Sequence, residues 1–193
     1  RLELDAKART LTVHDNGVGM SRDDVIAQIG TIAKSGTREL WQRIQEQSEE
    51  GLPGELIGQF GVGFYSAFMV ADKVVLVTRR AGQERATRWE SSGKGEYELA
   101  DADRAEQGTS VTLHLRDADP DADLQDFADP SVVRQVVKRY SDFVRYPIVL
   151  DGETLNSMKA IWKKRQSEVE KEEYEEFYKH ISHSFEPPLE TIT

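Results

Sequence analysis

Three closely spaced glycines constrain this chain more than any other feature. They lie in Gly58–Phe64 (GQFGVGF), between the apolar Leu56-Ile57 and residues 65–70, which favour a helix. Glycines at this spacing let backbone amides approach an anion without side-chain obstruction, and a helix N-terminus adds positive partial charge there. The segment therefore predicts a phosphate-holding loop. It is neither a P-loop nor a dinucleotide fingerprint, because no Gly-Lys-Ser/Thr follows and no parallel βαβ unit begins there.

Size and charge narrow the class of protein. The chain has 193 residues, 38% hydrophobic and 31% charged, which suits one globular domain with part of a second. Its net charge of -10 argues against binding nucleic acid or a membrane surface, and no apolar run is long enough to span a bilayer. It contains no cysteine, which excludes disulfides and thiolate metal sites and fits a cytoplasmic protein. Because it starts at Arg1 within a strand-like pattern, we expect an N-terminally truncated fragment.

The hydrophobic pattern predicts a mostly antiparallel sheet with helices. Alternation indicates a hairpin of strands at 1–5 and 10–15, and further strands at 73–79, 85–90, 95–99, 109–115 and 146–150. Helices are predicted after Ser21, which forms a capping box with Asp24, within 132–144, and after Ser167. Residues 31–55, rich in Gly, Ser, Gln and Glu, suit a mobile covering segment, and an ordinary surface loop and helix is the alternative.

Asp15 is the first residue that indicates chemistry. It shares a strand face with Leu11 and Val13, so we expect its carboxylate to be partly buried and to need hydrogen-bond donors. With Met20 lining an apolar slot, Asp15 could accept a hydrogen bond from an exocyclic amine, as an adenine ring requires. An ordinary Asp-Asn-Gly turn is the alternative.

Two further elements could complete a nucleotide site. In Gly30–Thr37, Lys34 could neutralise phosphate charge and Ser35 could donate a hydrogen bond, although a surface loop would look the same. Thr109 is in phase with a strand that faces the core, where a threonine bonded to the backbone is the simpler interpretation.

Together, in this order and spacing, these elements resemble the GHKL ATPase superfamily and, within it, the bacterial ninety-kilodalton heat-shock chaperones. The resemblance covers nearly the whole chain. The strings GTIAKSGT and GQFGVGFYSAF distinguish these chaperones from gyrase, MutL and histidine kinases. The matching segments are Asp15–Met20, Gly30–Thr37, Gly58–Asp72, Trp89–Gly93, Gly108-Thr109 and Leu155–Ile181.

The resemblance implies an α/β two-layer GHKL (Bergerat) sandwich, with helices on one face of a mostly antiparallel sheet, plus the start of a second α/β domain. Residues 1–152 would be a partial ATP-binding domain whose lid is about 31–58, and 153–193 a linker and the start of the middle domain. The implied function is an ATP-dependent chaperone that uses ATP and Mg²⁺. Hydrolysis would be coupled to closure of the lid and of a homodimer on unfolded client proteins.

The resemblance also implies a role for each matched residue. Asp15 would hold the adenine amino group, and Thr109 would share a water with it. Gly19 and Met20 would line the base pocket, while Lys34 and Ser35 would lie near the phosphates and the lid. The sugar and phosphates would contact the glycine loop through Gly61, Val62, Gly63 and Phe64.

Two family elements fall outside this sequence. The helix with the general-base Glu and the magnesium-binding Asn would precede the first hairpin, and the arginine that reaches the γ-phosphate would follow Thr193. Water activation and charge stabilisation are the main contributions to such hydrolysis, so we expect no catalytic residue in this chain. The alternatives are a non-hydrolysing fragment with weak or no nucleotide binding, and a GHKL relative that acts on DNA, which the acidic charge disfavours.

Overall fold

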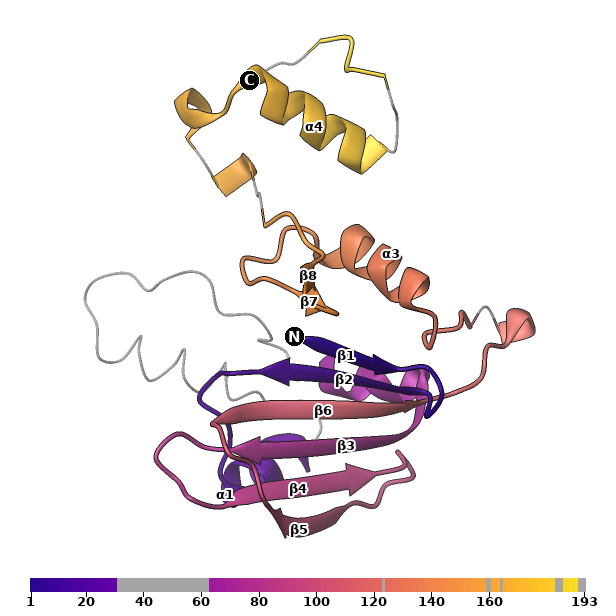
Figure 1. Ribbon diagram of the computed structural model, residues 1–193, viewed down its shortest axis with the longest axis vertical. Coiled ribbons are helices and arrows are strands. Elements are labelled where there is room, and N and C mark those ends of the chain that lie inside the picture. The colour runs from indigo at the N-terminus through magenta and orange to yellow at the C-terminus, as the bar shows by residue number, and fades with distance from the viewer. Residues whose placement is uncertain (31–62, 123, 159–160, 164, 183–185, 191–193) are drawn as a thin grey trace.

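The centre of the fold is an eight-stranded sheet in the order β5-β4-β3-β6-β2-β1-β7-β8 (Figure 1). The computed structural model describes residues 1–30, 63–122, 124–158, 161–163, 165–182 and 186–190. Neighbouring strands are antiparallel except β1 and β7, which are parallel. The strands are β1 (Leu2–Asp5), β2 (Thr10–Asp15), β3 (Ala71–Arg79), β4 (Ala86–Ser91), β5 (Glu98–Ala102), β6 (Gly108–Leu115), β7 (Val149–Leu150) and β8 (Glu153–Thr154).

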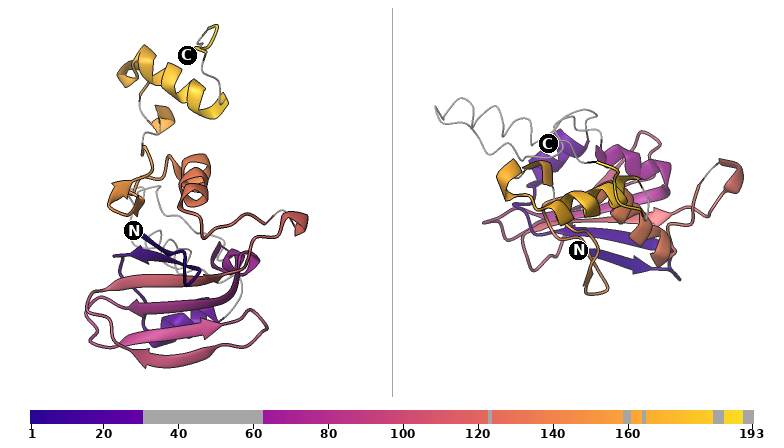
Figure 2. Two further views of the ribbon diagram at one scale, coloured as in Figure 1. Left: turned by 45° about the vertical axis from the view of Figure 1, so that its right-hand side comes forward. Right: turned by 90° about the horizontal axis from the view of Figure 1, so that it is seen from above.

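Short helical elements accompany the sheet, and α1 and η2 lie on the same face of it (Figure 2). A single turn of α-helix, α1, continues directly into the π-helix η1, and η2 is a 3-10 helix that packs on β3. The helical elements are α1 (Arg22–Asp24), η1 (Val25–Ile29), η2 (Gly63–Met69), η3 (Pro120–Ala122), α3 (Pro130–Ser141), η4 (Ile161–Lys163), η5 (Gln166–Glu168) and α4 (Lys171–Ser182). None of the helices in the described part of the chain is long and apolar enough to cross a membrane.

The main core forms where the inner face of the sheet meets these helices. Because side chains alternate along a strand, every second residue of β3 and β6 points inward. Val74 and Leu76 from β3 and Leu113 from β6 bury there against Val25 of η1 and Trp89 of β4. A second, smaller cluster joins α3 to β7 and contains Val133, Val137, Leu150 and Leu155.

The expected fold class is confirmed, since the protein is an α/β fold with a mostly antiparallel sheet and helices packed on one face. The capping box is confirmed as well, because the Ser21 side chain accepts from the Asp24 amide and the Asp24 carboxylate accepts from the Ser21 amide.

Two elements begin several residues later than predicted. The strand expected at 95–99 runs instead over Glu98–Ala102, following a bend that includes Gly93 and Gly95 at positive φ. The last helix begins at Lys171 rather than after Ser167, because Glu168 accepts from the Arg165 amide and holds residues 166–168 as the separate 3-10 turn η5.

The strand expected at 146–150 contains only Val149 and Leu150. The side chain of Asn156 explains the difference, because it accepts from the Ile148 amide at 2.7 Å and donates to the carbonyls of Val144 and Tyr146. These backbone groups are therefore satisfied without a strand partner. A two-residue turn at 151–152, both at positive φ, then leads to β8. β8 is part of the sheet, and the domain boundary at 152 stays a prediction.

Candidate functional site

Asp15, Thr109 and Thr78 form a row across three neighbouring strands. In the sheet register Asp15 of β2 pairs with Thr109 of β6, which pairs with Thr78 of β3. Directly paired residues point to the same face of a sheet, so all three side chains lie on the helical face. They lie at one end of the sheet, where β2 and β3 finish and β6 begins (Figure 1). The Asp15 Oδ1 atom accepts from the Thr109 amide at 3.2 Å and from the Gly17 amide at 2.9 Å.

Thr78 connects this row to the turn that precedes α1. It is 0% exposed, and its hydroxyl accepts from the Met20 amide at 2.9 Å. The same hydroxyl lies 3.0 Å from the Thr109 hydroxyl and donates to the Gly108 carbonyl at 3.2 Å. Thr78 thus fixes both residues that we expected beside the base. A role for Thr78 was not predicted from the sequence. The only sign of its burial there is that it follows Val74 and Leu76 at alternate positions along the strand.

The expectation that Asp15 is partly buried is wrong, because Asp15 is exposed. Along β2 the apolar core contacts reach Leu11, whereas Val13 is already 43% exposed. As the last residue of β2, Asp15 projects beyond the packed part of this face. Its Oδ2 atom has no hydrogen-bond partner among the described residues, so one carboxylate oxygen is held by backbone amides and the other is open to a donor.

Two glycines allow the backbone segments around the row to approach closely. Gly108 has φ +112°, and a β-carbon there would lie 2.3 Å from the Asp15 carbonyl oxygen. Gly19 has φ +65°, and its β-carbon would lie 2.0 Å from the Arg79 carbonyl oxygen. Only glycine fits either position, so Gly19 packs the turn against the end of β3 and Gly108 packs the start of β6 against the end of β2.

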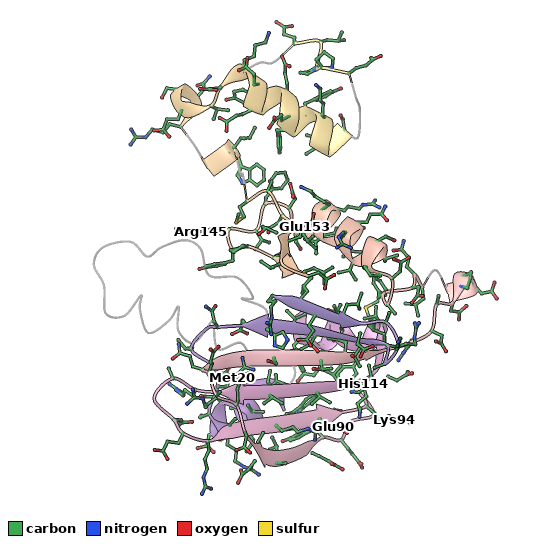
Figure 3. All side chains as sticks on the ribbon, viewed as in Figure 1. Met20, Glu90, Lys94, His114, Arg145 and Glu153 are labelled. Atoms are coloured by element: carbon green, nitrogen blue, oxygen red, sulfur yellow. The ribbon has the colours of Figure 1, made fainter. Side chains whose placement is uncertain are left out.

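Charged groups hold the segment that follows Met20. Figure 3 shows Met20 at the end of the sheet where β6 begins, at the entrance to α1. Burial raises the pKa of Asp24, but hydrogen bonds from Ser21 and the guanidinium of Arg80 outweigh this effect and lower that pKa below its ordinary value. The ionised carboxylate therefore anchors α1 to the end of β3 and keeps Met20 beside Thr78.

Phe64 belongs to an aromatic cluster beneath the helices. Its ring packs edge-on against Trp89, with centroids 5.4 Å apart, and Trp89 stacks on Tyr97 at 6.0 Å. Tyr65 donates its hydroxyl to the Ile29 carbonyl at 2.5 Å, which joins η2, begun by Gly63, to the end of η1. No described hydrogen bond connects this cluster to Asp15. Lys34, Ser35, Gly61, Val62 and the proposed lid at 31–58 lie outside the described residues.

The donors and acceptors of the row fit the amino edge of a heteroaromatic ring. An open carboxylate oxygen can accept from an exocyclic amine, the Thr109 hydroxyl can exchange a hydrogen bond with a ring nitrogen or a water, and Met20 offers apolar contact. In the ranges that the structure describes, no group of three or more His, Cys, Asp or Glu side chains could hold a metal ion.

Comparison with known proteins identifies the family of this chain. Residues 2–115 match the family described as histidine kinase-, DNA gyrase B-, and HSP90-like ATPase, and residues 149–193 match the Hsp90 protein family. The chain is 57% identical to the chaperone protein HtpG of Salinispora tropica, 53% to that of Salinispora arenicola and 49% to that of Mycobacterium tuberculosis. In each case the match covers 99% of this chain but 32% or 33% of the relative.

The chain therefore spans about a third of the length of the curated relatives it matches. The first family match alone covers more than half of the residues and includes the whole Asp15–Thr109–Thr78 row. This chain belongs to the family of histidine kinase-, DNA gyrase B- and HSP90-like ATPases.

Proposed function

We propose that this chain is the nucleotide-binding part of an ATP-dependent molecular chaperone. The observation that carries the proposal is the row of Asp15, Thr109 and Thr78, tied to Met20 at one end of the sheet. The relatives named HtpG support a chaperone, and the match of residues 149–193 to the Hsp90 family favours it over a relative that acts on DNA.

The row would recognise the base through the carboxylate of Asp15, which is held in a fixed orientation. Two backbone amides hold Oδ1 of Asp15, so Oδ2 is directed before a ligand arrives and can accept from the adenine amino group. The Thr109 hydroxyl would bind the adjacent ring edge directly or through a water, and Gly19 and Met20 would line the ring. Because Thr78 holds both Thr109 and Met20, the base would enter a site that is largely preorganised.

The finer parts of the proposal concern the phosphates. Lys34 and Ser35 would contact them from a lid at about 31–58, and Gly61, Val62, Gly63 and Phe64 would hold the sugar and phosphates. When bound, ATP would supply the phosphoryl bond whose hydrolysis would be coupled to lid and dimer closure on client proteins. Mg²⁺ is proposed as a cofactor of the complete protein, and no cluster of side chains in the described part of this chain is assigned to it. Hydrolysis, a homodimer, unfolded clients and a cytoplasmic location are proposed for the complete protein.

The test is nucleotide binding by the full-length protein with Asp15→Asn. The asparagine preserves size but replaces an acceptor-only carboxylate with an amide, so we expect ADP binding in calorimetry to be lost. Asp23→Asn is the matched control, since Asp23 is an exposed carboxylate in α1 outside the row. Unchanged ADP affinity in Asp15→Asn would refute the assigned role.

Two assays separate the alternative functions. We expect the 193-residue chain alone to release no phosphate above background, because hydrolysis is not assigned to any of its residues. Release comparable to that of an intact relative would overturn this expectation. A DNA-acting relative would instead bind DNA with an affinity that falls steeply with salt concentration.

A further inference from the structure

The strands that carry the row carry a second polar network on their other face. His14 comes directly before Asp15 in β2, and Ser110 comes directly after Thr109 in β6. These two residues pair with each other across the two strands. Since neighbouring residues of a strand point to opposite faces, these side chains lie on the outer face of the sheet, behind the row. This is the face that Figure 1 turns toward the viewer, with α1 and η2 behind it.

Four side chains are connected there. Nδ1 of His14 lies 2.7 Å from the Ser110 hydroxyl, and Nε2 lies 3.1 Å from the Glu3 carboxylate. Arg104 donates to the Ser110 hydroxyl and, through Nη2, to the carbonyl oxygen of Asp15 at 3.4 Å. We call Glu3, His14, Ser110 and Arg104 the outer relay. It joins β1, β2, β6 and the segment before β6, and Arg104 contacts the backbone of Asp15.

The chemistry of its two ends sets the direction of every hydrogen bond in the relay. Arg104 can only donate, so the Ser110 oxygen accepts from it and the Ser110 hydrogen is directed to Nδ1 of His14. The ionised Glu3 can only accept, so Nε2 of His14 carries the ring hydrogen. A neutral His14 with hydrogen on Nε2 therefore satisfies all four groups.

We propose that the outer relay is a positioning device for nucleotide binding, which keeps Asp15 and Thr109 in the geometry that receives the base. This inference rests on the proposed function and deepens it. Ser110 is 8% exposed and its oxygen is occupied by Arg104, so it positions other groups and does not act as a nucleophile. No side chain of the outer relay touches the base site. The relay reaches that site only through the carbonyl oxygen of Asp15, which Arg104 contacts.

Loss of one member breaks these connections. Without the His14 ring, the Ser110 hydroxyl hydrogen loses its acceptor and the Glu3 carboxylate loses the ring as a donor. Arg104 then holds the Asp15 carbonyl from a serine whose side chain is no longer fixed to β2. Nucleotide affinity should therefore fall when the His14 ring is removed.

The experiment measures ADP binding by the full-length protein in calorimetry. His14→Ala removes the ring that joins Ser110 to Glu3 and should weaken ADP binding about three- to tenfold, the effect of one lost hydrogen bond. His114→Ala is the matched control and should keep the affinity of the unaltered protein, since His114 lies on the same face of β6 toward its other end (Figure 3).

A second pair of variants tests the centre of the relay. Ser110→Ala removes the central hydroxyl and should weaken ADP binding about three- to tenfold, the effect of one lost hydrogen bond. Ser110→Thr restores a hydroxyl on a residue that suits a strand and should recover the affinity. Thermal unfolding of each variant checks that the fold is retained.

The outcomes are distinct. ADP affinity in His14→Ala that matches that in His114→Ala, or unchanged affinity in Ser110→Ala, overturns the relay while the proposed function stands. Absence of ADP binding by the unaltered protein overturns the proposed function and the relay with it. Weakened binding in His14→Ala but not in His114→Ala, with rescue of Ser110→Ala by Ser110→Thr, establishes the positioning role.

Discussion

Thr78→Val tests how strongly one buried hydroxyl organises the site. The substitution keeps the β-branched shape of the side chain in β3 and removes only its oxygen. That oxygen accepts from the Met20 amide and bonds to the Gly108 carbonyl and the Thr109 hydroxyl. Because Thr78 is 0% exposed, water cannot replace these hydrogen bonds without opening the sheet.

The magnitude follows from the groups left behind. Each buried polar group without a partner costs about 1–3 kcal/mol, and exchange of a hydroxyl for a methyl recovers part of that through apolar burial. We therefore expect the free energy of unfolding to fall by about 2 kcal/mol. With a urea dependence of about 2 kcal/mol per molar, the unfolding midpoint should fall by about 1 M. ADP affinity should fall as well, since Met20 and Thr109 lose their common anchor.

Thr87→Val provides the matched control. Thr87 lies opposite Thr78 in the β3–β4 ladder and is 5% exposed, but its hydroxyl makes no hydrogen bond within the described ranges. We expect this variant to match or exceed the stability of the unaltered chain and to keep its ADP affinity. Urea unfolding followed by tryptophan fluorescence, with calorimetry of ADP binding, compares the two. Equal midpoints for both variants would show that the Thr78 network does not organise this end of the sheet.

Two other changes have equally specific consequences. Gly108→Ala places a β-carbon 2.3 Å from a backbone oxygen at φ +112°, so thermal unfolding should show a larger loss than Gly82→Ala, where φ is +79° but the space is open. Burial raises the pKa of Asp142, but hydrogen bonds from Ser157 and Lys138 outweigh it and hold that pKa below its ordinary value of 3.8. Because the folded-state pKa is lowered, the stability it contributes is complete above 3.8 and is lost as the pH falls through the folded value. Asp142→Asn should remove this part of the acid dependence of the urea midpoint.

Much of the fold could be predicted because local pattern and strand pairing agree. Alternation in 1–5 and 10–15 marked a hairpin, and the structure pairs Leu4 with Leu11 as that pattern requires. The capping box depends only on Ser21 and Asp24, three positions apart in the sequence, and was equally predictable. That the strand expected at 146–150 contains only Val149 and Leu150 could not be predicted, because the preceding backbone groups bond to the side chain of Asn156, a contact that no local pattern reveals.

The site was only partly predictable for a related reason. Asp15 could be identified because a carboxylate in phase with Leu11 and Val13 is unusual. Its exposure could not, because the extent of the core along β2 depends on which helices pack over it. Thr78, in contrast, could not be identified from the sequence, because a threonine in an apolar strand pattern is common. Its importance arises from the register that brings it beside Thr109 and from the turn that brings in Met20.

Strand alternation and register together explain why the two faces of the sheet are coupled at this end. Asp15 and Thr109 face the helices, while His14 and Ser110, their neighbours in the chain, face outward, so neither pair can shift along the strand without moving the other. A one-residue slip between β2 and β6 would exchange the faces and separate both sets of hydrogen bonds at once. The outer relay therefore resists the same displacement that would misalign the base site. This is why changes on a surface without ligand contacts are expected to alter nucleotide affinity.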